Sequence, residues 1–373
     1  MRKVLAALSL AALVSTTAAA QSWHTAIGIQ GGFSRIKPAG TGQNDAFDGF
    51  DIPGSNFVLG ALGYSSLYAI IPVADKIALE PSFGASQVNI VAQNINSAHL
   101  GLRADYAFTR HIYGAVGAEL IYIGQVSPTQ HAGPLAVTAG VGYRMALSGR
   151  LNGRLEARFT ASQKSTGALN LPPLDVYALL FGVSTDLGAG RGGARGARMS
   201  DAMWSPVFGV SGGYFSAHFV GGPAVSGFAL PGVGSATAVG GLGIPLSQLP
   251  SLFAVIPVGN RLAIEPGLNF DRLQVLGGGF STVTSSLISV RADLAVSRTW
   301  YAGLGPVANY FKASGSKGAA QLGVSAAWGA RFHIVGDLGG RLEASYSMFA
   351  KHRILGLPPV NTLGFGGAVT MGL

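Results

Sequence analysis

The sequence contains one fifteen-residue segment twice, and this duplication constrains the fold more than any other feature. Residues 67–81 read LYAIIPVADKIALEP, and residues 252–266 read LFAVIPVGNRLAIEP. Further matches follow in the same order and at nearly the same spacing: residues 103–105 with 291–293, 154–156 with 341–343, and 171–173 with 357–359. Because ordered matches of this kind do not arise by chance, we expect the chain to fold as two copies of one unit.

The composition of the flanking segments sets the boundaries of the copies. Residues 1–20 combine Arg2 and Lys3 with an apolar stretch and a small-residue end, which is typical of a cleaved signal peptide. Residues 188–203 are rich in Gly and Arg and predict a flexible periplasmic linker. We therefore expect an exported chain with a first copy at residues 21–187 and a second copy at residues 204–373.

Each copy consists of segments in which apolar residues occupy alternate positions. Residues 135–147, LAVTAGVGYRMAL, are an example. Only 11% of residues are charged and the mean hydropathy is +0.39, yet no apolar run after the first twenty residues approaches the length of a membrane helix. Alternation with period two is the strand signature, and it recurs in about eight segments per copy. The fold class is thus predicted to be all-β.

The connections between these segments alternate in length. Tight turns are expected at residues 74–75, 110 and 148–149, whereas the connections at residues 35–55, 91–96, 124–133 and 163–174 are longer and more polar. Short turns at one end and long loops at the other are typical of an up-and-down transmembrane β-barrel of the outer membrane. Pro81 and Pro266 fall inside predicted strands and cannot donate to a ladder, so we expect a β-bulge at each.

In these features the chain resembles the small eight-stranded outer-membrane barrels of Gram-negative bacteria, the OmpA/OmpX-like group, present as a tandem duplication. The resemblance rests on the signal peptide, the alternation, the loop lengths and an alternating last strand: Leu363, Phe365, Val369, Met371, Leu373. It implies two antiparallel up-and-down barrels of eight strands each, located in the cell outer membrane. The leading hypothesis for the function is a non-enzymatic outer-membrane protein with a structural or surface-interaction role.

Two other functions remain open on the sequence. One barrel of about 16 strands would make the chain a diffusion porin. The linker at residues 188–203 is longer than the turns of porins and favours two barrels, in which residues 23–33 pair with 177–187 and no ladder crosses between the copies. A lipid-modifying outer-membrane enzyme is the third alternative, and it is disfavoured because no Ser-His-carboxylate pattern is found.

The repeated glutamate of the duplicated segment identifies the candidate site. Glu80 alternates with the apolar residues Leu79 and Pro81 and should therefore point into the barrel, because a charge that faces lipid is unfavourable. The same argument, applied to the other charged residues at the same height, predicts a salt-bridge network in the periplasmic half of each lumen. Its members are Glu80, Arg103, Asp105, Arg144, Arg154 and Glu156 in the first copy, and Glu265, Arg291, Asp293, Arg331, Arg341 and Glu343 in the second.

The sequence also limits cofactors and partners. It contains no cysteine, which excludes disulfides and thiol-bound metals, and no nucleotide-binding or metal-binding pattern. No catalytic residue, cofactor or metal is therefore expected. The formal net charge of +9 includes two charges in the signal peptide and suits anionic lipid headgroups. Outer-membrane lipid and lipopolysaccharide are the candidate partners, nucleic acid is not expected, and the oligomeric state stays open.

Overall fold

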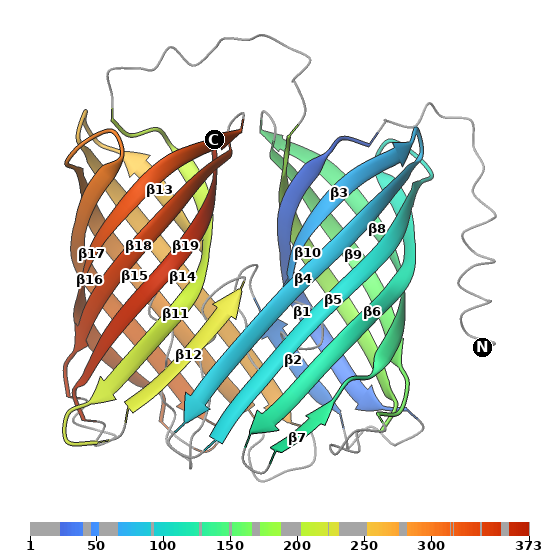
Figure 1. The fold of residues 1–373 in the computed structure, drawn as a ribbon, viewed down its shortest axis with the longest axis horizontal. Coiled ribbons are helices and arrows are strands. Elements are labelled where there is room, and N and C mark those ends of the chain that lie inside the picture. Colours follow the sequence, from blue (N-terminus) through green and yellow to red (C-terminus); the bar gives the residue numbers. More distant parts are fainter. Residues whose placement is uncertain are drawn as a thin grey trace.

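The computed structural model of the chain is an antiparallel all-β structure built from two closed barrels that stand side by side (Figure 1). It describes residues 23–39, 46–51, 66–90, 93–126, 129–148, 151–165, 172–187, 203–222, 224–230, 252–275, 282–313, 315, 317–335, 338–351 and 358–372. The predicted signal peptide and most of the predicted linker lie outside these residues. Within this part of the chain, no helix is long and apolar enough to cross a membrane.

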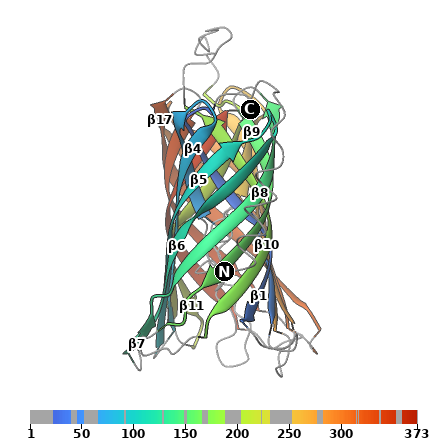
Figure 2. The ribbon, with the colours of Figure 1, turned by 90° about the vertical axis from the view of Figure 1, so that its right-hand side faces the viewer.

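The first barrel is a closed ring of eight antiparallel strands from the first copy. In ring order they are β1 (Ala26–Pro38), β3 (Ser66–Ala74), β4 (Ile77–Ile90), β5 (Gln93–Ala107), β6 (Ile112–Val126), β8 (Leu135–Ser148), β9 (Leu151–Ser162) and β10 (Leu174–Asp186). The last strand, β10, pairs with β1 along its whole length. A short strand, β7 (Thr129–Ala132), extends the hairpin of β6. Figure 2 shows β4, β5 and β6 crossing the height of the barrel at a tilt.

The second barrel repeats this ring with strands from the second copy. Its members are β11 (Val207–Phe219), β13 (Leu252–Pro257), β14 (Leu262–Val275), β15 (Thr282–Ala295), β16 (Trp300–Ala313), β17 (Ala319–Val335), β18 (Leu338–Phe349) and β19 (Val360–Gly372). The ring closes where β19 pairs with β11. The predicted fold class of two tandem eight-stranded barrels is therefore confirmed.

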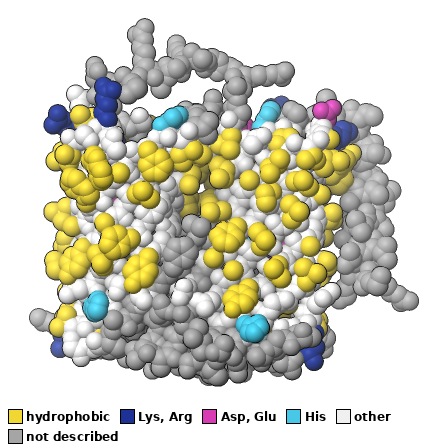
Figure 3. All heavy atoms as spheres, viewed as in Figure 1, with side chains coloured by type: hydrophobic (Ala, Val, Ile, Leu, Met, Phe, Trp, Pro, Cys, Tyr) yellow, Lys and Arg dark blue, Asp and Glu magenta, His cyan; other side chains and the backbone are white. Residues whose placement is uncertain are grey.

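The alternation in the sequence decides which face of each strand is buried. On β8, Leu135 and Val137 are about half exposed on the outer wall, whereas Ala136 and Thr138 are buried in the lumen. Apolar side chains cover the walls of both barrels, and the Lys, Arg and His side chains visible on this face lie near the two ends (Figure 3). The barrels are thus apolar outside and polar inside, the reverse of a soluble protein.

Two further strands connect the barrels, and the sequence did not predict them. β2 (Phe47–Asp51) lies in the predicted loop at residues 35–55, and β12 (Ala224–Leu230) follows β11 at the corresponding place in the second copy. β2 pairs with β1 on one side and with β14 of the other barrel on the other side. In the same way, β12 pairs with β11 and with β4. Each copy thus contributes one bridging strand that pairs with the other copy (Figure 1).

These bridges exist because β3 and β13 are short. β3 pairs only with residues 26–30 of β1, which leaves residues 32–36 to pair with β2. We call the end of the molecule that carries the bridging strands the outer end, and the end that carries the tight turns the inner end. All of the 19 strands except β3, β7 and β13 form one continuous ring at the outer end, which therefore has sixteen strands. The expectation that no ladder crosses between the copies was wrong for the outer end.

An apolar cluster between the two barrels holds their walls together. Leu151 of the first barrel is buried with Leu338 and Met371 of the second. Ile27 and Val183 from the first barrel and Phe208 from the second pack against this cluster. The barrels are therefore joined by ladders at the outer end and by apolar contact between their walls.

The proline that ends each duplicated segment interrupts the ladder without shifting it. Pro81 has no partner on β3, and Pro266 has none on β13, although the pairs on both sides of each proline keep one register. The only register shift between β3 and β4 lies at Pro72 and Ala74, next to the turn. The predicted bulges at Pro81 and Pro266 were therefore wrong, because a missing donor removes a hydrogen bond but need not insert a residue.

Candidate functional site

The lumen of the first barrel contains a layer of paired charges in its inner half. Glu80 on β4 lies directly opposite Arg103 on β5, and Arg103 Nη2 is 2.6 Å from Glu80 Oε1. Arg103 Nη1 also lies 2.5 Å from Glu156 Oε1, across the lumen on β9. Arg154 on β9 pairs with the other oxygen of Glu80. All four side chains are buried, so the guanidinium and carboxylate groups satisfy one another away from water.

Asp105 and the glycines of the neighbouring strands complete this layer. Asp105 Oδ1 lies 3.8 Å from Arg103 Nη2. Gly182 on β10 leaves room for Arg154, because a Cβ at this position would lie 3.0 Å from Arg154 Cγ. Gly117 on β6 likewise leaves room for Arg103, because a Cβ at this position would lie 2.7 Å from Arg103 Cγ. The layer therefore depends on small residues as well as on charged ones.

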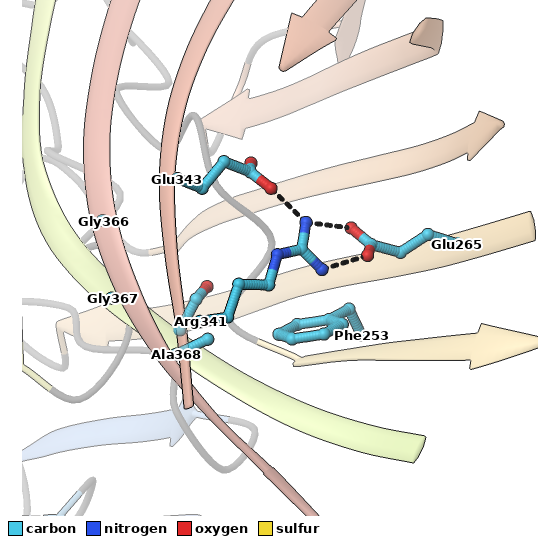
Figure 4. Close-up of a pocket in the computed structure, with 8 residues that line it drawn as sticks. Phe253, Glu265, Arg341, Glu343, Gly366, Gly367 and Ala368 are labelled. Carbon is cyan, nitrogen blue, oxygen red and sulfur yellow. Dashed lines mark hydrogen bonds and ion pairs between the residues drawn. The ribbon is translucent and has the colours of Figure 1, made fainter. Parts of the chain in front are cut away.

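The second barrel contains the corresponding layer. Arg291 Nη2 lies 2.7 Å from Glu265 Oε1 and 2.8 Å from Glu343 Oε2, and Arg291 Nε lies 2.7 Å from Asp293 Oδ1. Arg341 forms ion pairs with both Glu265 and Glu343 (Figure 4). Each arginine thus links carboxylates from different strands, which ties opposite walls of the lumen together.

Arg144 and Arg331, which the sequence placed in the networks, lie outside them. Arg144 on β8 is directly opposite Arg154 on β9, and Arg331 has the same relation to Arg341. Like charges on opposed positions repel each other, which favours separation of the two guanidinium groups. The guanidinium carbon of Arg144 lies instead 3.7 Å from the centroid of the Trp23 ring at the inner end.

The second copy repeats this arrangement at the inner end. Arg331 lies 3.7 Å from the centroid of the Trp204 ring, and its Nη1 donates a hydrogen bond of 2.8 Å to the carbonyl of Met203. Trp204 Nε1 donates to the carbonyl of Arg261, as Trp23 Nε1 does to that of Lys76. A stacked Trp-Arg pair therefore lies at the inner mouth of each barrel.

One tyrosine in each copy belongs to the ionic layer, although the pattern of charged residues in the sequence does not indicate it. The hydroxyl of Tyr113 donates a hydrogen bond of 2.6 Å to Glu156 Oε2, and the hydroxyl of Tyr301 donates one of 2.6 Å to Glu343 Oε2. Tyr113 lies near the start of β6 and Tyr301 near the start of β16, and both point into the lumen. The matching inward positions of the two tyrosines could have identified both as lumen residues, but the pattern of charged residues alone does not include them.

The first barrel has additional polar groups that the second lacks. Arg158 Nε lies 2.7 Å from Glu156 Oε1, and Arg158 Nη1 lies 3.7 Å from Glu119 Oε1. Gln30 Oε1 accepts hydrogen bonds from both Arg154 and Arg158. Arg158 could have been predicted, because it lies two residues beyond Glu156 on the same face.

The corresponding positions of the second copy carry smaller or uncharged residues. Ser345 occupies the position that corresponds to Arg158, Val307 the position of Glu119, and Ser211 the position of Gln30. Beside Ser211 the structure contains a cavity of about 20 Å³, lined also by Phe253, Glu265, Arg341, Glu343 and residues 366–368 (Figure 4). A cavity of this size holds about one water molecule. This cavity therefore has room for a water molecule but not for a larger solute.

A serine and a histidine approach each other in the first lumen. Ser82 Oγ lies 3.2 Å from His99 Nε2, and both side chains are buried. His99 Nδ1 has no hydrogen-bond partner within the described part of the chain, so no carboxylate orients the ring. In the second copy Gly267 and Leu287 take these positions. Among the described residues, no group of His, Asp and Glu has the arrangement of a metal site.

Comparisons with known proteins support no family assignment. No protein-family model matches the chain, and no curated protein matches it. Solved structures that match the chain include a CymD monoaromatic hydrocarbon channel, with 9% identity over 98% of this chain and 93% of the channel and a TM-score of 0.33. The COG4313 outer membrane channel from Pseudomonas putida F1 has 10% identity over 95% of this chain and 98% of that chain, with a TM-score of 0.24. The NanC porin has 7% identity over 79% of this chain and 100% of its own, with a TM-score of 0.22.

Proposed function

We propose that the chain is a non-enzymatic outer-membrane protein whose two barrels are closed and serve a structural or surface-interaction role. The observation that carries this proposal is the ionic layer in each lumen. In both barrels it links strands from opposite walls through buried ion pairs between arginine and carboxylate groups. Moving a large solute through either barrel would require these pairs to separate inside a narrow lumen, where an unpaired charge is costly.

The outer walls support a location in the outer membrane. Large apolar side chains are exposed around both barrels, among them Leu100, Leu304, Leu322 and Leu342, each more than half exposed. Such a surface is far larger than the apolar patches of soluble proteins and suits contact with lipid. Outer-membrane lipid and lipopolysaccharide are the partners we propose for it, after export by a signal peptide at residues 1–20.

Planar-bilayer conductance of the purified full-length chain tests the closed lumens. We expect small or absent conductance, because an ionic layer blocks each barrel. Stable channels of nanosiemens size would overturn the proposal. A variant with Glu80→Gln and Glu265→Gln keeps the size of both side chains and removes one carboxylate from each layer. If ions pass through the lumens at all, this variant should conduct more than the unmodified chain.

A diffusion porin is the second candidate, and one observation favours it. The sixteen-strand ring at the outer end encloses both lumens in one wall, as a porin wall encloses one lumen. Below this ring the sheet divides into two eight-stranded rings, which have little room beyond their own side chains. The conductance measurement separates the two candidates directly, because a porin of this strand number conducts strongly.

A further inference from the structure

One row of side chains at the outer end crosses from the bridge onto the second barrel. The ladder pairs Phe33 on β1 with Phe50 on β2, Phe50 with Arg272 on β14, Arg272 with Thr284 on β15, and Thr284 with Lys312 on β16. These five residues form one cross-strand row, and all point to the outside of the ring, since they share the face of the exposed wall. We call them the cationic row.

Both cations of the row lie at the outer rim and face the lipid side. Arg272 is on the same face of β14 as the exposed Leu268, and Lys312 is on the same face of β16 as the exposed Leu304. Arg272 lies three residues before the end of its strand, and Lys312 lies one residue before the end of its own. Their positions therefore correspond to the headgroup region, just beyond the apolar band of the wall.

The two charges are available and close enough to act on one anion. Among the described residues, neither Arg272 nor Lys312 forms an ion pair, whereas the nearby Arg35 is paired with Asp48 at 2.6 Å. Only β15 separates their strands, so their Cα atoms are about 10 Å apart. Both side chains can reach a phosphate between them, and the hydroxyl of Thr284 lies in that gap as a further donor.

The surface below the row suits acyl chains. The next row toward the membrane centre consists of Phe270, Ser286 and Tyr310, and the one after it consists of Leu268, Ile288 and Ala308. Phe270 also contacts Phe50 of the bridge, with ring centroids 5.8 Å apart. From the rim toward the membrane centre, the surface carries cations, then aromatic rings, then aliphatic side chains. This order matches that of a lipid, in which the phosphate is followed by glycerol or sugar and then by hydrocarbon.

The opposite face of the molecule provides an internal comparison. There the equivalent row runs from Tyr214 on β11 through Phe228 on β12 to Gln87, Asn96 and Gly124 on β4, β5 and β6. The strands and register correspond, but Gln87 replaces Arg272, and Gly124 replaces Lys312. The charge is therefore confined to one of two faces with the same backbone arrangement.

From these observations we propose that the cationic row binds the phosphate of one outer-leaflet lipid. Of the two faces with this backbone arrangement, the one beside the β2 bridge then carries the specific lipid-binding site. The inference deepens the proposed function, because it names a phosphorylated lipid as the ligand of the surface and places it on the second barrel beside the β2 bridge. A free phosphate ion would use the two cations but not the apolar rows below them, so the lipid is the occupant that uses the whole surface.

Native mass spectrometry of the detergent-solubilised full-length chain tests the proposal. The probes are dioleoylphosphatidic acid and dioleoylphosphatidylcholine, which differ in headgroup charge but not in acyl chains. We expect preferential binding of one phosphatidic acid, and we expect Arg272→Gln with Lys312→Gln to weaken it by about tenfold or more. The control is Arg261→Gln with Arg298→Gln, which removes two exposed arginines at the inner end of the same barrel and should leave the affinity unchanged.

A second variant transfers the row to the neutral face. Gln87→Arg with Gly124→Lys reproduces the two charges at the same spacing. At Gly124 a Cβ would meet the end of the Tyr122 side chain, which can rotate away. We expect this variant, once its folding is verified by heat-modifiable gel mobility, to bind a second phosphatidic acid.

Three results of the lipid-binding measurements would overturn the proposal. They are equal binding of the two lipids by the unmodified chain, full affinity in the Arg272→Gln, Lys312→Gln variant, and an unchanged stoichiometry in the folded gain-of-charge variant. Displacement of phosphatidic acid by equimolar inorganic phosphate would also overturn it, in favour of a free-anion site. None of these results depends on whether the lumens conduct, so they are separate from the test of the proposed function.

Discussion

At the scale of single residues, the ionic layers show how a narrow barrel can bury charge. Each buried carboxylate of Glu80 and Glu156 meets arginines from two strands, so neither depends on one partner. A buried ion pair gains little over an apolar pair of the same size, but the loss of one partner leaves the other charge unpaired. The main contribution of the layers is therefore to specify which strands face each other across the lumen, and their net contribution to the free energy of folding is small.

Removal of one arginine from the layer should destabilise the first barrel. Arg154→Ala leaves Glu80 with Arg103 as its remaining partner and takes a donor from Gln30, so the cost of breaking a fully buried pair, roughly 3–5 kcal/mol, is the upper limit of the expected loss. The free energy of unfolding in urea, followed by heat-modifiable gel mobility, measures the loss. Arg35→Ala is the matched control: its pair with Asp48 is partly exposed, and such pairs contribute about 0–1 kcal/mol. Equal losses in the two variants would show that the lumen is wide and wet.

The alternation of residues predicts the face on which a charged side chain lies but not its partner. Alternation placed Glu80, Arg103 and Arg341 on the inward face, and the structure places them there in ion pairs. Alternation fixes a face but not a partner, so it could not show that Arg144 lies opposite Arg154 and turns to Trp23. The partner depends on strand register, which comes from ladders between segments that are distant in the sequence.

At the scale of elements, the bridging strands are the part of the fold that no local pattern predicts. β2 reads FDGFD, and its glycine and two aspartates are typical of a loop. It is a strand because β1 and β14 have unpaired outer halves on its two sides, and pairing with β2 gives the backbone N–H and C=O groups of both strands their partners. The long strands, by contrast, were predictable because each shows its own alternation over many residues.

Weakening one bridge should weaken the whole outer ring. Phe50 contacts Phe181 of the first barrel and Phe270 of the second, with centroids 6.1 Å and 5.8 Å away. Phe50→Ala removes both contacts and should reduce the free energy of unfolding by about 2 kcal/mol, below the cost for a fully buried ring. Phe365→Ala is the comparison, because Phe365 is about half exposed on the outer wall of one barrel. If both variants lose the same stability, the bridge contacts contribute nothing specific.

At the scale of the whole molecule, two closed barrels share one outer wall. The duplication predicts two equal units, and the structure adds that each unit lends a strand to the other, β2 to β14 and β12 to β4. This reciprocal exchange relates the copies as the two subunits of a symmetric dimer are related. The shared wall fixes the orientation of the two lumens, so the faces at the bridges differ only in the residues that they carry.

Thiol cross-linking in the membrane tests this architecture most directly, because the chain contains no cysteine and any introduced pair reports without background. Phe33→Cys with Leu179→Cys joins β1 to β10 and probes the closure of the first barrel, and Phe50→Cys with Arg272→Cys joins β2 to β14 and probes the bridge. With a short bifunctional thiol reagent, we expect both pairs to cross-link within one chain. Absence of the first cross-link in the folded chain would show that β1 does not pair with β10, as in one large barrel, and would contradict the closure of the first barrel.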